Sequence, residues 1–139
     1  MITTAEAIDR IKTRIGVEGP AVTAPVESGH VRRFAEAIGD PNPRWEKEAP
    51  PTFLVALAPV SLHLSDAEEY GQGWLNGGNR FEYFAAVMVG DLITAKGRVV
   101  DVYDKAGSSG NLLFIIFETD YTNQRGEKVA RLRGTAIRR

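Results

Sequence analysis

The chain has 139 residues, of which 43% are hydrophobic and 25% are charged, a composition typical of one compact globular domain spanning residues 1–139. Its 17 basic and 18 acidic side chains leave a formal charge of −1, which argues against nucleic acid or an anionic membrane as a partner. The absence of cysteine excludes disulfides, thiolate metal sites and a cysteine nucleophile, and suits a reducing compartment. Residues 1–16 lack the apolar run of a signal peptide or membrane span, so the expected location is the cytoplasm.

Two amphipathic helices are predicted in the first third of the chain. Residues 4–14 place isoleucines three and four positions apart, with Thr3 or Thr4 as the N-cap. An extended, proline-bounded segment follows at residues 21–26. The second helix has Ser28 as its predicted cap and ends at Gly39, where a left-handed residue commonly follows a helix. Its apolar side chains recur at helical spacing: Val31, Phe34, Ala35 and Ile38.

A proline-rich loop and a short apolar segment come next. Residues 40–51 contain four prolines, which exclude a regular helix because each ring fixes its own φ and restricts the residue before it. Thr52 can cap a helix at residues 53–58, where every side chain is apolar. Such a helix is expected to be buried on all sides. Residues 60–72 are predicted to form an irregular connection with an exposed acidic end.

The remainder of the chain is predicted to be a sheet. Strands are expected at residues 81–87, 92–103, 112–122 and 127–137, where β-branched and aromatic residues replace helix formers. Turns are expected at residues 89–91 and 123–126, with a flexible hairpin loop at 105–111. The last three strands are joined by short loops and must therefore pair antiparallel. Two helices followed by this meander indicate a curved antiparallel sheet around a buried helix.

Four stretches together resemble a known family: VESGHVRRFAEAIGDPNPRW, APPTF, LNGGNRFEY with VMVGD shortly after it, and TDYTNQRGEKVARLRGTAI. They resemble the MaoC-like, (R)-specific enoyl-thioester hydratases and dehydratases, and within them the N-terminal, FAS1-like dehydratase half. The resemblance implies an α+β hotdog fold, an antiparallel sheet of about five strands wrapped around a central buried helix. It also implies hydration of a trans-2-enoyl thioester, or the reverse dehydration, without metal or redox cofactor.

The loop GDPNPRW departs from the catalytic motif of that family. Catalytic members carry Asp-x-Asn-Pro-x-His, in which Asp and His together hold the water and move its proton. Asp40 and Asn42 match, so Asp40 is the candidate catalytic residue and Asn42 a candidate for substrate binding, but Trp45 stands where the His belongs. An indole N–H is a donor only and cannot take up that proton. Of the two histidines, His30 is expected to be a surface or capping residue and His63 to have a structural role.

Each residue of this loop also has a structural interpretation. Asp40 is either an ordinary turn residue, whose side chain bonds the backbone two positions on, or a substrate contact. Trp45 is either a core or interface aromatic or a wall of the acyl tunnel. Between this loop and the APPTF-like segment only residues 46–49 intervene, fewer than is usual in the family, so a shortened lid over the pocket is expected.

Further substrate-binding positions are implied by the resemblance. In catalytic relatives a backbone amide at the start of the central helix receives the thioester carbonyl, and here Thr52 or Phe53 would provide it, the alternative being a plain helix cap. Gly77 and Gly78 precede a strand, as a glycine pair also does in hotdog thioesterases, although close backbone packing explains them equally well. The one candidate basic patch is the C-terminal run Arg131, Arg133, Arg138 and Arg139, in which Arg131 and Arg133 share one strand face. This run is either part of a solvated sheet face or a contact for coenzyme phosphates.

The main functional hypothesis is a non-catalytic, substrate-binding half that works with a hotdog partner carrying the intact Asp and His. The expected ligand is an acyl-CoA or acyl-carrier thioester, in a homodimer or heterodimer of hotdog subunits, without cofactor, nucleic acid or membrane. No His, Asp and Glu cluster has metal-ligand spacing, so no metal site is expected. The alternatives are a self-contained homodimeric hydratase with a rearranged site, a hotdog acyl-CoA thioesterase, and a binding module without chemistry.

Overall fold

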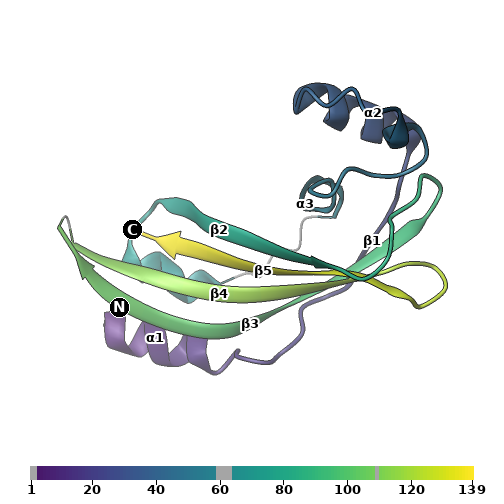
Figure 1. Ribbon diagram of the computed structural model, residues 1–139. Helices are drawn as coiled ribbons and strands as arrows, with labels where there is room; N and C mark the ends of the chain where they lie inside the picture. Colours follow the sequence, from purple (N-terminus) through teal and green to yellow (C-terminus); the bar gives the residue numbers. More distant parts are fainter. Residues whose placement is uncertain (1–2, 59–63, 109) are drawn as a thin grey trace.

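The computed structural model describes residues 3–58, 64–108 and 110–139. In this part of the chain, five strands form one antiparallel sheet in the order β1-β3-β4-β5-β2 (Figure 1). The elements are α1 (Thr4–Lys12), β1 (Val22–Pro25), α2 (Ser28–Ala37), the 3₁₀ turn η1 (Pro43–Glu46), α3 (Leu54–Leu57), the 3₁₀ segment η2 (Ser65–Tyr70), β2 (Trp74–Tyr83), β3 (Leu92–Gly107), β4 (Gly110–Thr122) and β5 (Lys128–Arg138). Within the residues described, none of the helices is both long enough and apolar enough to cross a membrane.

The predicted meander of three long strands is confirmed. β3 pairs antiparallel with β4, and β4 with β5. The turn between β4 and β5 is built by Asn123, whose Oδ1 accepts hydrogen bonds from the backbone N–H groups of Arg125 and Glu127, at 3.0 and 3.1 Å. Gly126 completes the turn with φ 73°, a conformation that glycine adopts without steric cost. Local turn chemistry therefore fixes this hairpin.

Two strand boundaries differ from the prediction. β2 runs over Trp74–Tyr83 instead of residues 81–87, because it pairs along its length with β5 and accommodates its glycines in a bulge between Asn76 and Gly78. The hairpin loop predicted at residues 105–111 is largely strand, since pairing continues to Gly107 and Gly110. In both places cross-strand pairing overrides the low strand propensity of Gly and Asn.

The first two helices agree with the prediction in position and differ at their ends. α1 begins with a capping box, in which Thr3 and Glu6 bond each other's backbone N–H groups, and it ends at Lys12 rather than at residue 14. Ser28 is not the cap of α2, because the helix starts at Ser28 itself and Glu27 precedes it without a side-chain hydrogen bond. Gly39 has φ 69°, as expected of a residue that terminates a helix.

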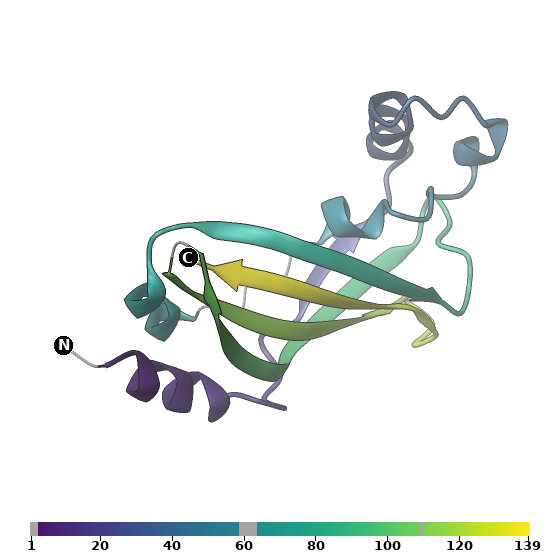
Figure 2. The ribbon, with the colours of Figure 1, turned by 60° about the vertical axis from the view of Figure 1, so that its left-hand side comes forward.

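The core forms two clusters at opposite ends of one sheet face. α1 and η2 lie at one end and α2 and α3 at the other, in both ribbon views (Figure 1, Figure 2). Ile11, Leu113 and Ile115 belong to the first cluster. Phe53 is the largest fully buried side chain and belongs to the second.

The antiparallel five-stranded sheet confirms the predicted fold class, but the apolar helix differs from its prediction. α3 is one turn long, and although Leu54 and Leu57 are buried, Val55 is 46% exposed. The prediction that this helix is buried on every side is therefore wrong. Its exposed side leaves apolar surface open beside the sheet.

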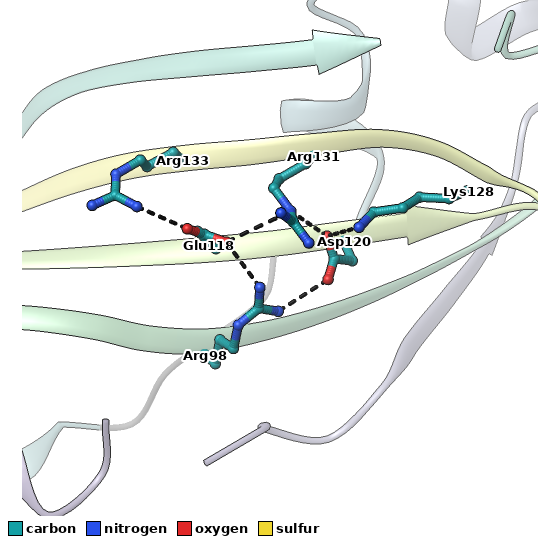
Figure 3. Close-up of polar contacts among 6 residues, drawn as sticks. All are labelled: Arg98, Glu118, Asp120, Lys128, Arg131 and Arg133. Atoms are coloured by element: carbon teal, nitrogen blue, oxygen red, sulfur yellow. Dashed lines mark hydrogen bonds and ion pairs between the residues drawn. The ribbon is translucent and has the colours of Figure 1, made fainter. Parts of the chain in front are cut away.

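An ion-pair network covers the other face of the sheet (Figure 3). The carboxylates of Glu118 and Asp120 lie at its centre, and the alternation of side chains along β4 places them opposite the buried Thr119 and Tyr121. Four basic side chains surround them, with shortest N···O distances of 2.8 to 3.0 Å: Arg98, Lys128, Arg131 and Arg133. Arg131 and Arg133 are thus already paired with carboxylates on their own sheet face.

Asp120→Asn is expected to lower the free energy of unfolding by about 1–2 kcal/mol at pH 7, because three cations lose a shared acceptor. Burial raises the pKa of Asp120, but hydrogen bonds from Arg131, Lys128 and Arg98 outweigh it and hold this pKa well below the usual range. The ionised carboxylate thus stabilises the fold above its unfolded pKa of about 4, and this contribution is lost as the pH falls through the lower folded value.

Urea unfolding of both proteins between pH 7 and pH 2 measures this difference, which should shrink below about pH 4. Asp66→Asn is the control, since Asp66 makes a single ion pair of 3.7 Å with Arg10. A gap between wild type and Asp120→Asn that stays constant over this pH range contradicts the assignment.

Candidate functional site

The loop between α2 and α3 is organised by its own side chains. Asp40 Oδ1 accepts a hydrogen bond of 3.1 Å from the backbone N–H of Asn42, and Asn42 Oδ1 accepts one of 3.0 Å from that of Arg44. These are consecutive Asx turns. They lead into η1, where Pro43 occupies an early position that needs no N–H donor. The structure therefore shows the turn geometry expected of Asp40, with one carboxylate oxygen engaged by the loop.

Trp45 packs inward from η1. Its ring contacts the core cluster around Phe53, and its Nε1 is buried without a hydrogen-bond partner in the part of the chain that the structure describes. The Arg44 guanidinium lies 5.8 Å from the ring centroid. The residue at the family's histidine position is thus a packing residue, and its one polar group is a donor without acid–base capacity.

Trp45 lines a cavity of about 390 Å³ on one side of α3, here called the Trp45 cavity. Most of its wall is apolar, from the segment before α3 and the one after β2: Ala49, Pro50, Pro51, Leu54, Ala85, Ala86 and Val87. Its polar rim holds Arg44 and Glu48, whose Nε and Oε2 are 3.1 Å apart, and Tyr83. Burial raises the pKa of Tyr83 to about 12, so this hydroxyl stays a neutral donor near pH 7. The cavity is suited to hold a ligand in which an apolar group adjoins a hydrogen-bond acceptor, with Tyr83 as the donor to that acceptor.

Glu48 and Tyr83 were not identified from the sequence. Arg44 and Glu48 are four residues apart, a spacing that indicates an ion pair in a helix. The prolines of this loop argue against a helix, so the spacing could not be used for a prediction. Tyr83 was assigned to the interior of a predicted strand, whereas it ends β2 at the rim of the cavity. Nothing local in the sequence brings it near residue 45.

A second cavity of about 420 Å³ lies on the other side of α3, and we call it the Trp74 cavity. Its walls come from α3 with its C-cap and from β2, β4 and β5: Val55, Ala58, Trp74, Leu75, Asn76, Asn79, Phe117, Thr119, Tyr121, Leu132, Thr135 and Ala136. Most of this lining is apolar, with side-chain amides and hydroxyls spaced along it. Burial, with a smaller contribution from Tyr83, raises the pKa of Tyr121 to about 12.

Gly77 and Gly78 lie in the bulge of β2 next to the Trp74 cavity. A Cβ on Gly77 would be 2.9 Å from Thr135 Cγ2 and 3.0 Å from Ile137 Cδ1, closer than side chains pack. Gly78 has φ 129°, which L-residues rarely adopt. Close packing and backbone conformation thus account for both glycines.

The start of α3 offers fewer free donors than the sequence implied. The Phe53 N–H donates a 3.0 Å hydrogen bond to the Pro50 carbonyl, which leaves Thr52, exposed at the surface, as the remaining predicted donor. The Phe53 ring is fully buried and makes edge contacts with His30 and Phe34, at centroid distances of 4.8 and 5.6 Å. His30 is thus half-buried and packed against the core, whereas the sequence indicated a surface or capping residue. His63 lies outside the described residues.

The structure brings Trp45 and the segment leading to Thr52 together at one cavity. Neither of the two cavities is lined by the other sequence-predicted site residues: Asp40, Asn42, Thr52, Phe53, Gly77 and Gly78. The part of the chain that the structure describes contains no group of three or more His, Asp or Glu side chains placed to hold a metal ion.

Comparison with known proteins gives a family and a set of structural neighbours. Residues 13–132 match the model of the FAS1-like dehydratase domain region. The chain is 28% identical over 116 residues to a UPF0336 protein of Thermobifida fusca, covering 71% of this chain and 73% of the relative. It is 30% identical over 117 residues to a UPF0336 protein of Parafrankia sp., covering 73% and 75%.

Three solved structures share its fold. A chain of the ChsH1-ChsH2 complex from Mycobacterium tuberculosis superposes with a TM-score of 0.78 at 20% identity, covering 97% of this chain and 90% of that one. A chain of the HadBC (3R-hydroxyacyl-ACP dehydratase) complex from the same organism has a TM-score of 0.66 at 19% identity, covering 89% and 98%. The R-hydratase PhaJ1 of Pseudomonas aeruginosa has a TM-score of 0.58 at 16% identity, covering 89% and 80%.

These matches confirm the resemblance that the four sequence stretches indicated. The strand order and the antiparallel pairing agree with hotdog proteins of the MaoC-like and (R)-hydratase type. The chain belongs to the FAS1-like dehydratase domain family and has the hotdog fold.

Proposed function

We propose that this protein is the substrate-binding half of an enoyl-thioester hydratase or 3-hydroxyacyl-thioester dehydratase, acting with a second hotdog subunit that supplies the catalytic Asp and His. The observation that carries the proposal is the residue at position 45. A tryptophan packed against the core stands there, and its indole N–H has no acid–base capacity. Recognition of the acyl thioester is then the task of this chain.

The chemistry of hydration explains why the residue at position 45 decides whether this chain can be catalytic on its own. Adding water to a conjugated thioester requires a base for the attacking water and an acid for the α-carbon. One positioned acid–base group typically contributes a factor of about 10²–10⁴ in rate. Asp40 remains in this chain, but one of its oxygens is bonded within its own loop and it does not line the Trp45 cavity.

The edge of the sheet supports a hotdog partner. β2 is an edge strand of ten residues, exposed along nearly its whole length. Trp74, Leu75 and Tyr83 are 47%, 41% and 44% exposed, which is unusual for an edge that stays uncovered. The neighbouring ChsH1-ChsH2 and HadBC structures are complexes of two differently named chains. A heterodimer suits the proposal better than a homodimer, because a second copy would bring another Trp45 instead of an imidazole.

The Trp45 cavity is the proposed place for the acyl group of an acyl-CoA or acyl-carrier thioester. Its volume lies within the range of small-molecule sites, and its walls are mainly apolar. The proposal requires no redox cofactor, since the addition of water to a conjugated thioester is redox-neutral and needs only acid–base catalysis. It also includes a cytoplasmic location, which the absence of cysteine favours.

Tryptophan fluorescence tests the binding step, because the chain has only two tryptophans. In the Trp74→Phe variant, Trp45 is the sole fluorescent tryptophan. Titration with a saturated short-chain acyl-CoA should change its emission, and the change should saturate as the acyl-CoA concentration rises. The matched Trp45→Phe variant, which reports on Trp74 alone, should respond less. Binding seen by calorimetry without any change in Trp45 emission would place the acyl group elsewhere, and an absence of binding would remove the proposal.

A self-contained hydratase is the second candidate, because a carboxylate does line the Trp45 cavity. Glu48 has a side chain 23% exposed and pairs with Arg44. Released from this pair, it could serve as a base in a rearranged site. Turnover by the isolated chain that disappears in Glu48→Gln, and not in Asp40→Asn, would identify this alternative.

A further inference from the structure

β4 is apolar on both of its faces over residues 112–117. These residues read LLFIIF, six consecutive apolar side chains. A strand with one solvated face alternates apolar and polar residues, whereas a continuous apolar run is typical of a strand that is covered on both faces. One face of this run is covered, because Leu113 and Ile115 are buried in the core cluster that contains Ile11 of α1. The run therefore predicts a second cover on the opposite face.

The opposite face is the one that carries the ion-pair network, and we call it the outer face. Phe114 alternates with Leu113 and Ile115 along β4, so its side chain lies on the outer face. Its direct cross-strand neighbours are Tyr103 in β3 and Ile137 in β5, and the Tyr103 and Phe114 rings stack at a centroid distance of 5.0 Å. With the other outward residues of the run they form the outer patch: Tyr103, Leu112, Phe114, Ile116 and Ile137. All five are half-buried, and none of them belongs to or packs against either core cluster of the described residues.

Two exposed charges of the outer face, Lys96 and Glu82, take part in none of the ion pairs within residues 3–58, 64–108 and 110–139. They lie at the two ends of one row of side chains. The row crosses four strands through direct cross-strand neighbours: Lys96, Asp120, Arg131 and Glu82. Its two ends are about 14 Å apart, since neighbouring strands are about 4.8 Å apart. The row thus has a positive end and a negative end that cannot pair within one chain.

A two-fold axis along the strands, between β4 and β5, makes the outer face complementary to itself. The axis reverses the order of the strands, so each row meets the same row of a second copy. Phe114 then lies opposite Ile137 of the second copy. Of the four kinds of charge contact, the first three join opposite signs and the last joins like signs: Lys96 with Glu82, Asp120 with Arg131, Glu118 with Arg133, and Arg98 with Arg80. A partner whose surface has one sign of charge would instead repel one end of the row.

We propose that the outer face is an interface between two copies of this chain, packed back to back. The outer patch supplies the apolar part of this interface and the charged rows supply its polar part, a division that is common in protein interfaces. Sheets that pack face to face lie about 10 Å apart, a distance that side chains such as Phe114 and Ile137 fill. This interface leaves the backbone edge of β2 open to a hotdog partner and needs no thioester, so the inference is independent of the proposed function.

Sedimentation velocity of the isolated chain over a range of concentrations tests the inference. The wild-type chain of 15.2 kDa should reach twice this mass as its concentration rises. Phe114→Gln should weaken self-association at least about tenfold, because it places an amide in the apolar part of the interface. Ile38→Gln is the matched control, since Ile38 is 51% exposed at the C-cap of α2, outside the outer face, and it should leave the association unchanged.

A charge exchange tests the two-fold arrangement at exposed positions, where substitution leaves the core intact. Glu82→Lys and Lys96→Glu should each weaken the dimer by up to about tenfold, because two like-charge contacts replace two ion pairs. The double variant restores opposite charges across the axis, and its affinity should return to within about threefold of the wild type. Circular dichroism of each variant checks that the fold is retained.

Three outcomes would overturn the inference: a wild-type chain that stays monomeric at every concentration, a dimer that is insensitive to Phe114→Gln, or a double variant that associates no better than the single ones. A dimer that responds to none of these changes would be assigned to the β2 edge instead of the outer face. If Phe114→Gln does not fold, the charge exchange alone decides, because it leaves the outer patch unchanged.

Discussion

Phe53→Ala is expected to lower the free energy of unfolding by about 3–5 kcal/mol. The Phe53 ring is fully buried where α3 begins, and it makes edge contacts with both His30 and Phe34 of α2. Its removal leaves a cavity between α2, α3 and the sheet that the proline-flanked segment before it cannot easily close. Since domains of this size are stable by only about 5–15 kcal/mol, the variant should be close to unfolding at 37 °C.

Urea denaturation followed by circular dichroism measures this loss. Val55→Ala is the matched control, because Val55 lies two residues away in the same turn and is 46% exposed. Its change should be below about 1 kcal/mol. Equal losses in the two variants would show that α3 is not anchored by Phe53, and would remove the basis for a fixed Trp45 cavity beside it.

Much of the fold could be predicted because its signals are local. The β4–β5 hairpin follows from Asn123 and Gly126, and α2 from its apolar spacing and Gly39. β2 could not be delimited in the same way, since its first half is held by pairing with β5 and not by its own propensity. The length and exposure of α3 likewise depend on the tertiary structure around it. A run of apolar residues in the sequence does not indicate how much of the helix that structure covers.

The candidate site was predicted at the level of the loop and not at the level of the cavity. The Asx turn of Asp40 is one of the two interpretations that its residue type allows, and the structure shows it together with a second Asx turn at Asn42. The partners of Trp45 come from elsewhere in the chain: Tyr83 reaches the same cavity only because β2 ends there.

The second large effect is expected in turnover. An intact hydratase of this type would be expected to work at about 1–10³ s⁻¹, as enzymes typically do. Without an imidazole at position 45, the loss of one acid–base group alone predicts a rate lower by a factor of about 10²–10⁴. Asp40→Asn should then change neither this residual rate nor the affinity for acyl-CoA appreciably, because Asp40 does not line the cavity.

The most direct measurement mixes the purified chain, without any partner, with a short trans-2-enoyl-CoA and follows the absorbance of the conjugated thioester. The same preparation must bind the saturated acyl-CoA in a parallel titration, so that a lack of turnover cannot come from misfolded protein. We predict saturable binding and hydration at least about 100-fold slower than an ordinary enzyme rate. Rapid hydration that Asp40→Asn or Glu48→Gln abolishes would contradict the account and show that this chain carries its own catalytic groups.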